Sequence, residues 1–231
     1  MQLPLDPDSR CSHCAMDKHC FHEAAVPEAF KAFISAHQTV DSGQDLFVRD
    51  QSDIQVAVVQ SGAFKLTQTT PTGDRQIINV ALPGDYVGLS RLFQHASPVA
   101  ATAVSRSRIC LLDHERLNDN PRQAIQLLRR ELESSRWHQS LGMYEAPARM
   151  GQWFLKLADN NERRGLSRQR LTLPLNRTEL ANYLVMALET VSRTLKKLQT
   201  QGLIAVNGKT IDILDETGVR ALAYPDPQLI S

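Results

Sequence analysis

The chain has 231 residues, with 26 basic and 25 acidic side chains and a formal net charge of +1. Hydrophobic residues make up 42% and charged residues 22%, a composition that is typical of a globular protein and excludes a disordered or fibrous chain. No stretch approaches the roughly 18 consecutive apolar residues of a membrane helix, and residues 1–6 do not read as a secretory signal. We therefore expect a cytoplasmic protein whose four cysteines are reduced thiols or metal ligands.

The near-zero net charge hides a difference between two parts of the chain. Residues 148–231 hold twelve basic and eight acidic side chains, whereas residues 1–147 hold fourteen and seventeen. An excess of basic residues favours, though only mildly, a polyanionic partner for the C-terminal part.

The first 22 residues carry three of the four cysteines, Cys11, Cys14 and Cys20, and show little apolar periodicity. Such a segment cannot bury a core by itself, so we expect it to be disordered or held by something that it binds.

Between about Val40 and Leu112 the sequence changes to short β-type runs separated by glycine and proline. The predicted strands cover residues 56–59, 64–67, 76–82 and 107–112. Several short strands with turns at this spacing favour an antiparallel sandwich or barrel. The last of these strands contains the fourth cysteine, Cys110.

A helix is predicted after the barrel, because Pro121 is typical of the first helical position and opens a run without glycine as far as Gly142. Ile125, Leu128 and Leu132 follow a coiled-coil-like spacing, which polar or small residues continue. Two interpretations stay open: the helix packs on its own barrel, or it pairs with a second copy through a marginally stable seam.

Three helices are predicted in the C-terminal part, over residues 149–158, 177–184 and 188–200. The second follows a capping-box pattern, with Asn176 at the N-cap and Glu179 three residues later. The third ends before a glycine that is suited to the position after a helix.

A β-hairpin is predicted next, because residues 203–206 and 210–213 flank the turn sequence Asn-Gly-Lys at 207–209. Two short helices joined by a tight turn and followed by a hairpin indicate a winged helix-turn-helix.

The helix over residues 188–200 has two distinct faces. The face expected to be buried consists of apolar residues at helical spacing: Leu188, Val191, Leu195 and Leu198. The opposite face is polar: Glu189, Ser192, Arg193 and Lys196. It offers an acceptor for cytosine N4, a hydroxyl and a guanidinium suited to guanine O6 and N7. A solvated face is the plain alternative, but the helix-turn before it and the hairpin after it favour DNA reading.

The stretch 181–193, with Ala-Asn-Tyr-Leu at its start and Leu-Glu-Thr-Val-Ser-Arg at its end, resembles the recognition region of the CRP/FNR family of bacterial regulators. The Glu-x-x-Ser-Arg arrangement is similar to that of the FNR branch, named for fumarate and nitrate reduction. The resemblance extends over nearly the whole chain. It implies that Glu189, Ser192 and Arg193 contact base edges in half-sites like TTGAT, arranged as an inverted repeat. It also implies a homodimer, with RNA polymerase as a further partner.

Two positions depart from the family pattern. Val185 stands where the family commonly has glycine in the turn, and a β-branched residue is poorly suited to a positive φ. Ala187 stands where Thr or Ser usually caps the recognition helix, a change that costs about 1 kcal/mol. We expect these changes to affect the turn and the affinity for DNA more than the function.

The four cysteines also match the FNR branch, which carries C-x2-C-x5-C near the N-terminus and a fourth cysteine late in its β-roll. Cys11, Cys14 and Cys20 form the first part and Cys110 the second. Four thiolates are what a [4Fe–4S] cluster needs. A zinc site remains an alternative, with the same thiolates or with nearby histidines, namely His13, His19 and His22. A redox dithiol is disfavoured, since no βαβ pattern surrounds the first two cysteines.

The resemblance further implies how the cluster acts. O2 would convert [4Fe–4S] to [2Fe–2S] and loosen the packing of the N-terminal arm against the β-roll and the dimer helix. The separated monomers would lose the geometry that two half-sites require.

We therefore predict an α+β chain in four segments: a cysteine-bearing arm at 1–22, a β-roll sensory domain at 23–118, a dimerisation helix at 119–146 and a winged helix-turn-helix DNA-binding domain at 147–231. The β-roll is expected to be a double-stranded β-helix like that of cyclic-nucleotide-binding domains.

Neither a cyclic nucleotide, a membrane nor a catalysed reaction is expected. Relatives that bind cAMP carry a phosphate-binding arginine where residues 97–103 of this chain have none, and an uncharged loop is a poor cradle for phosphate. No Gly-x-Ser-x-Gly, P-loop or His-Glu-x-x-His motif occurs. The expected function is that of an oxygen- or redox-responsive transcription regulator.

Overall fold

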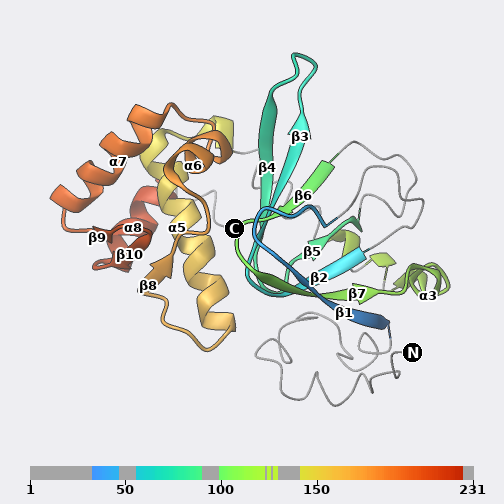
Figure 1. The fold of residues 1–231 in the computed structure, drawn as a ribbon. Helices are drawn as coiled ribbons and strands as arrows, with labels where there is room; N and C mark the ends of the chain where they lie inside the picture. Colours follow the sequence, from blue (N-terminus) through green and yellow to red (C-terminus); the bar gives the residue numbers. More distant parts are fainter. Residues whose placement is uncertain are drawn as a thin grey trace. The chain divides into compact units, whose positions relative to one another are not determined.

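The computed structural model describes residues 33–46, 56–89, 99–122, 124, 125, 127–129 and 141–225. The chain divides into two compact units, Met1–Ser135 and Arg136–Ser231 (Figure 1). No helix within the described ranges is long and apolar enough to cross a membrane.

The first unit is built on two antiparallel sheets. One has the strand order β1-β7-β2-β5, with the bounds Ile34–Val40 for β1, Ser107–Leu112 for β7, Val56–Ser61 for β2 and Tyr86–Val87 for β5. The other has the order β4-β3-β6, with the bounds Arg75–Ala81 for β4, Phe64–Thr69 for β3 and Val99–Ala103 for β6. The predicted antiparallel β body is thereby confirmed, and with it the α+β fold class.

The two faces of the four-stranded sheet bury two different sets of side chains, because successive residues of a strand point to opposite faces. Ile109 of β7 and Val59 of β2 pack with Phe64 of the three-stranded sheet, so their side chains lie between the sheets. Cys110 of β7 and Val58 of β2 belong to a second cluster on the other face, which we call the outer cluster. It contains the following buried residues: Phe33, Ile34, Val56, Val58, Tyr86, Leu89, Cys110, Leu112, Leu117 and Leu127.

Helical segments that follow β7 contribute to the outer cluster. Helix α3 (His114–Asn118) starts where the Asp113 side chain accepts hydrogen bonds from two backbone N–H groups. A further helical stretch begins at Pro121, as predicted, and its described helical positions continue to 129. Leu117 of α3 and Leu127 of this stretch are both fully buried in the outer cluster.

Strand β1 was not among the predicted strands. Only its two end residues, Ile34 and Val40, are buried. It is an edge strand that pairs with β7 alone, so it lacks the alternating apolar pattern that a strand packed on one face would show. The pairing sets His37 of β1 opposite Cys110 of β7.

The second unit surrounds helix α5 (Ala146–Arg163), which is longer at both ends than the predicted 149–158. A 3-10 turn, η2 (Leu141–Met143), precedes it. Its sheet has the order β8-β10-β9, with the bounds Arg170–Thr172, Thr210–Ile213 and Ile204–Asn207. The predicted hairpin is thus confirmed as β9 and β10, whereas β8 and helix α8 (Glu216–Ala223) are additions to the prediction.

Close packing joins α5 to its neighbours. The ring of Trp153 meets the ring of Tyr183 edge to face, with 5.0 Å between centroids. A Cβ atom added to Gly151 would come within 3.1 Å of the Leu222 side chain, so the missing side chain lets α8 approach. The Gln152 side-chain amide donates a hydrogen bond of 2.9 Å to the carbonyl oxygen of Ala223.

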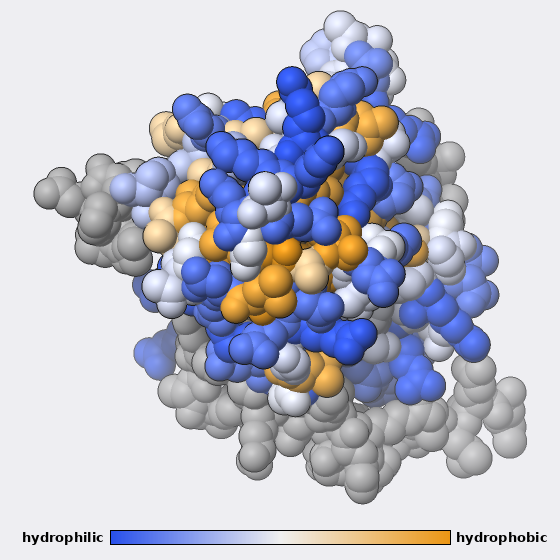
Figure 2. All heavy atoms as spheres, turned by 90° about the vertical axis from the view of Figure 1, so that its left-hand side faces the viewer, coloured by the Kyte–Doolittle hydropathy of each residue, from blue (hydrophilic) through white to orange (hydrophobic). Residues whose placement is uncertain are grey.

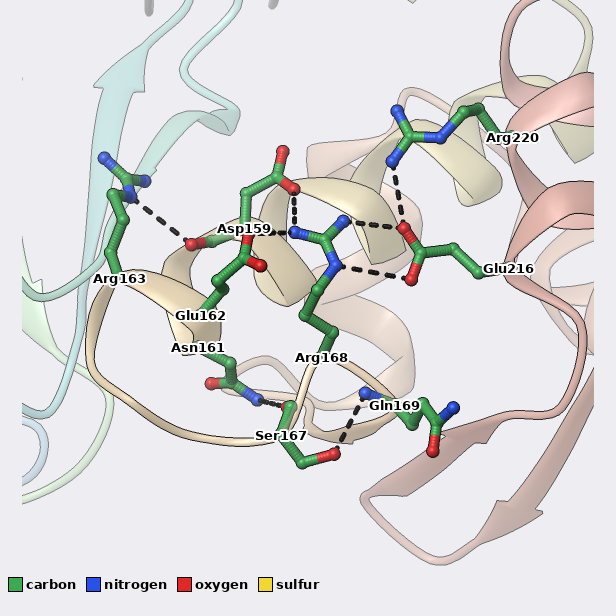
Figure 3. A network of polar contacts seen from close by, with 9 residues as sticks. All are labelled: Asp159, Asn161, Glu162, Arg163, Ser167, Arg168, Gln169, Glu216 and Arg220. Carbon is green, nitrogen blue, oxygen red and sulfur yellow. Dashed lines mark hydrogen bonds and ion pairs between the residues drawn. The ribbon is translucent and has the colours of Figure 1, made fainter.

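An ionic network ties α8 to the C-terminal end of α5 (Figure 3). The Arg168 guanidinium contacts Asp159 at 2.8 Å, Glu162 at 2.6 Å and Glu216 at 2.7 Å. Glu216 also accepts a hydrogen bond of 2.9 Å from Arg220. The hydrogen bond from Arg168 is the main reason that the pKa of the Glu216 carboxyl lies below its ordinary value.

Candidate functional site

Helices α6 (Arg177–Tyr183) and α7 (Leu188–Thr200) form the predicted helix-turn-helix. The capping box is present: the N–H of Glu179 donates to Asn176 Oδ1 at 2.9 Å, and the N–H of Asn176 donates to Glu179 Oε2 at 3.0 Å. The bounds of α7 agree with the predicted 188–200.

The polar residues predicted to read DNA lie on the exposed side of α7. Each of the following side chains is exposed: Glu189, Ser192, Arg193 and Lys196. None of them forms an ion pair with a residue in the described ranges. The face drawn in Figure 2 is largely hydrophilic, with hydrophobic side chains gathered toward its centre. The helix thus presents an acid, a hydroxyl and two cations together.

The prediction that Leu188 belongs to the buried face was wrong. Its side chain is 42% exposed, and the buried residues of α7 are Val191, Thr194, Leu195 and Leu198. At about 100° per residue, this buried arc is centred on Val191 and Leu198. Leu188 therefore lies at the edge of the arc, next to the polar face.

The turn between the two helices keeps a left-handed residue although glycine is absent. Val185 has φ 54°, and no other non-glycine residue in the described ranges has a positive φ. The turn is closed by backbone hydrogen bonds from Val185 to Asn182 at 3.2 Å and from Met186 to Ala181 at 2.9 Å. Ala187 makes no side-chain cap to α7, as expected for alanine.

Arg149 of α5 holds this turn from the side, a role that sequence reasoning missed. Its Nη1 donates to the carbonyl oxygens of Leu184 at 3.1 Å and Val185 at 2.7 Å. Its Nε donates to the carbonyl oxygen of Tyr144 at 2.7 Å. A cation beside the last carbonyls of α6 is favourable because these groups have no partner inside the helix. Nothing in the spacing of the sequence singles out this arginine.

Arg177 connects the start of α6 with the tip of the hairpin. Its Nη2 donates to the carbonyl oxygen of Gly208 at 3.3 Å. Burial lowers the pKa of the guanidinium from its ordinary value. The hairpin that forms the wing is therefore fixed to the same helix-turn-helix.

Cys110 lies in the outer cluster of the β-roll and is buried there. Its Sγ atom is 3.4 Å from Nδ1 of His37, the residue opposite it on β1. His37 could not be singled out from the sequence, because a register between strands is needed to bring the two residues together.

The described part of the chain holds one of the proposed cluster ligands. Cys11, Cys14 and Cys20 lie outside it, as do the three histidines considered for zinc. Within the described ranges, no group of three or more His, Cys, Asp or Glu side chains could hold a metal ion. A metal site at Cys110 with three or more such ligands would therefore take at least one of them from outside these ranges. A thiol on a β-strand, beside an imidazole, fits the part of an anchoring ligand.

Two of the three residues of the predicted dimer-helix seam lie within the described ranges. Ile125 is 53% exposed, Leu128 is partly buried, and Leu132 lies outside the described residues. Leu127, by contrast, is buried in the outer cluster. The helical stretch thus packs on its own barrel through one face and exposes Ile125 on another.

Comparison with known proteins gives consistent results for the two units. A family model described as "Crp-like helix-turn-helix domain" matches residues 148–222, and one described as "Cyclic nucleotide-binding domain" matches residues 37–120. The crystal structure of FixK2 from Bradyrhizobium japonicum is 24% identical and superposes with a TM-score of 0.66 over 81% of this chain and 96% of its own. This likeness supports the fold.

Curated relatives match over nearly the full length. The chain is 30% identical to "Transcriptional activator protein anr" of Pseudomonas aeruginosa, covering 94% of this chain and 93% of that protein. It is 28% identical to "Fumarate and nitrate reduction regulatory protein" of Salmonella typhi, covering 92% and 90%. The relatives are transcription regulators and not enzymes. The chain therefore belongs to the CRP/FNR family of DNA-binding transcription regulators, in its FNR branch.

Proposed function

We propose that this protein is an oxygen- or redox-responsive regulator whose homodimer binds inverted repeats of TTGAT type, and whose dimerisation depends on a [4Fe–4S] cluster at Cys11, Cys14, Cys20 and Cys110. The observation that carries this proposal is that Cys110 and Leu127 belong to one buried cluster, which links the strand that carries the thiol to the helix that would pair. RNA polymerase is the further partner, since relatives are named transcriptional activators.

Three residues of α7 supply the DNA reading. The Glu189 carboxylate accepts a hydrogen bond from cytosine N4, and the Arg193 guanidinium donates to guanine O6 and N7. The Ser192 hydroxyl serves either as donor or as acceptor at a base edge. Lys196, two turns beyond Glu189 on the same face, lies where a phosphate contact is expected. A dimer brings two such helices to successive half-sites.

Substitution of two neighbouring cations separates base reading from phosphate contact. Arg193→Ala should weaken binding to a TTGAT duplex by about 1–3 kcal/mol and relax the preference for guanine at one position. Lys196→Ala should weaken binding to all sequences alike and reduce the salt slope by about one. Fluorescence anisotropy without oxygen, over a series of salt concentrations, measures both. Equal effects of the two variants on sequence preference would contradict the assignment of Arg193.

The outer cluster carries the proposed link between sensing and pairing. A [4Fe–4S] cluster, when bound, supplies a centre that reacts with oxygen. Cys110 would hold it at the β-strand, and the buried cluster that contains Cys110 also contains Phe33, Leu117 and Leu127. Interiors are close-packed, so a change of ligation at Cys110 shifts its neighbours. Only a ligand that favours the dimer over the monomer can move that equilibrium.

Replacement of the strand cysteine tests the sensing part. Cys110→Ser should abolish the dimer that forms without oxygen, as measured by light scattering. Val58→Thr is the matched control, because Val58 pairs with Cys110 across β2 and β7 and lies in the same cluster. Like Cys110→Ser, this substitution introduces a buried hydroxyl. The control should keep the dimer. An unchanged dimer in Cys110→Ser would contradict the proposal.

The alternative is a regulator of the same fold with zinc at the cysteines. The contact between His37 and Cys110 is the observation that favours it, because imidazole and thiolate are both common zinc ligands. A colourless protein that contains stoichiometric zinc after purification without oxygen would support this alternative over the cluster.

A further inference from the structure

His37 and Cys110 form a side-chain contact between the edge strand β1 and its neighbour β7. The two residues are opposite each other in the register of the strands, and Sγ of Cys110 lies 3.4 Å from Nδ1 of His37. The imidazole is partly buried and the cysteine is 4% exposed. Water therefore competes little for this contact, and the low local dielectric strengthens it.

Ligation of a metal by Cys110 would fix the direction of the hydrogen bond. A cysteine binds iron as the thiolate, which has no proton to donate. Nδ1 of His37 must then carry the proton and donate to Sγ. A neutral imidazole can carry its proton on either ring nitrogen, so this tautomer requires no change of charge.

A hydrogen bond to a ligating sulfur changes the properties of the cluster that the sulfur holds. Such bonds are among the features that set the reduction potential of an iron–sulfur cluster. Oxidation in air takes an electron from the cluster to O2, so the cluster and its thiolates carry less negative charge afterwards. An N–H donor stabilises the more negative state more strongly. It therefore opposes the oxidation.

We propose that His37 is a positioning residue of the sensor, which slows oxidation of the cluster by donating a hydrogen bond from Nδ1 to the Cys110 thiolate. This inference rests on the cluster proposed above. It assigns His37 to the control of the oxygen response and not to metal ligation. The response to oxygen is then set in part by a side chain that lies 73 residues from the cysteine along the chain.

Two substitutions that branch alike at Cγ separate the hydrogen bond from the shape of the side chain. Asparagine places an amide N–H near the position of Nδ1, whereas leucine has no donor. Each full-length protein is purified without oxygen, its iron and sulfide are assayed, and its visible absorption is followed in air. His37→Leu should lose this absorption about three- to tenfold faster than the wild-type protein, and its cluster should have a lower reduction potential. His37→Asn should restore both properties to near the wild-type values.

Gln38→Leu is the matched control, because Gln38 is the next residue of β1, is exposed and pairs with Ile109 rather than with the cysteine. It should lose its absorption at the wild-type rate. Equal rates for His37→Leu and the wild-type protein, or a His37→Asn variant as fast as His37→Leu, would overturn the inference and leave the cluster in place.

The loading of the variants is itself informative. A His37→Leu protein without cluster, beside a fully loaded His37→Asn, would support the hydrogen bond, because the two side chains differ in the donor. Absence of the cluster from both variants would count against it. A wild-type protein that contains no iron and sulfide would instead overturn the proposed function, and the inference with it.

Discussion

Val185, in the turn of the helix-turn-helix, has a strained backbone conformation. It is 55% exposed and has φ 54°, a conformation that costs an L-residue about 1–2 kcal/mol. Val185→Gly should therefore raise the free energy of unfolding of the C-terminal unit by about 1 kcal/mol, after allowance for the larger entropy of unfolded glycine. Urea unfolding followed by circular dichroism measures the change.

Val185→Ala separates the two sources of strain at this position. Alanine removes the β-branch but keeps a Cβ atom in the left-handed region, so its gain should be smaller than that of glycine. A glycine variant no more stable than the alanine variant would show that Val185 is not strained.

The burial or exposure of a side chain was predicted correctly where the residue lies in the middle of a helix face. Glu189 and Arg193 lie well within the polar face and are exposed as expected. Leu188 lies at the edge of the apolar stripe, where periodicity does not decide between burial and exposure. Arg149 was missed for another reason: its partners are carbonyl groups, which leave no trace in the sequence.

At the scale of elements, α5 acts as the support for the recognition helix. Arg149→Ala would leave the carbonyls of Tyr144, Leu184 and Val185 without their charged donor. We expect a loss of about 2–3 kcal/mol in the free energy of unfolding together with weaker DNA binding. Arg170→Ala is the control, because its ion pair of 3.7 Å with Asp212 is exposed and worth little. Comparable losses in both variants would contradict the role of Arg149.

The contact between α8 and the end of α5 should depend on pH. Arg168 lowers the pKa of Glu216 in the folded protein, whereas the unfolded chain has the ordinary value of about 4.3. The ionised carboxylate therefore stabilises the unit above that value, and the contribution is lost as pH falls through the lower folded pKa. Glu216→Gln should lose less stability than the wild-type protein between about pH 5 and pH 3. The melting temperatures of the two proteins, measured across this pH range, test the prediction. An equal fall in melting temperature for both proteins would rule out the linkage.

Elements with complete local signals were predicted closely. The capping box, the helical period and the Asn-Gly turn fixed α6, α7 and the hairpin within one or two residues. Strands β1 and β8 were missed because each is an edge strand that pairs on one side only. Helix α8 begins at Glu216 and contains Gly218, which interrupts the helical signal.

At the scale of the whole molecule, one side-chain cluster joins the proposed sensor to the proposed dimer contact. Cys110 and Leu127 share it, while Ile125 of the same helical stretch stays exposed. The proposed cysteine ligands, the β-roll and the helix could each be predicted from the sequence. The sequence could not predict that the strand cysteine lies in the outer cluster rather than between the sheets, because this depends on which face of the folded sheet each residue of β7 points to.

Sedimentation velocity, recorded at a protein and at a visible wavelength, tests the central claim most directly. The protein is purified without oxygen and measured before and after exposure to air. We predict that the visible absorption of an iron–sulfur cluster sediments with a species of twice the 25.8 kDa chain mass, and that air replaces this species by the monomer. A dimer that persists in air, or a dimer without visible absorption, would contradict control of pairing by the cluster.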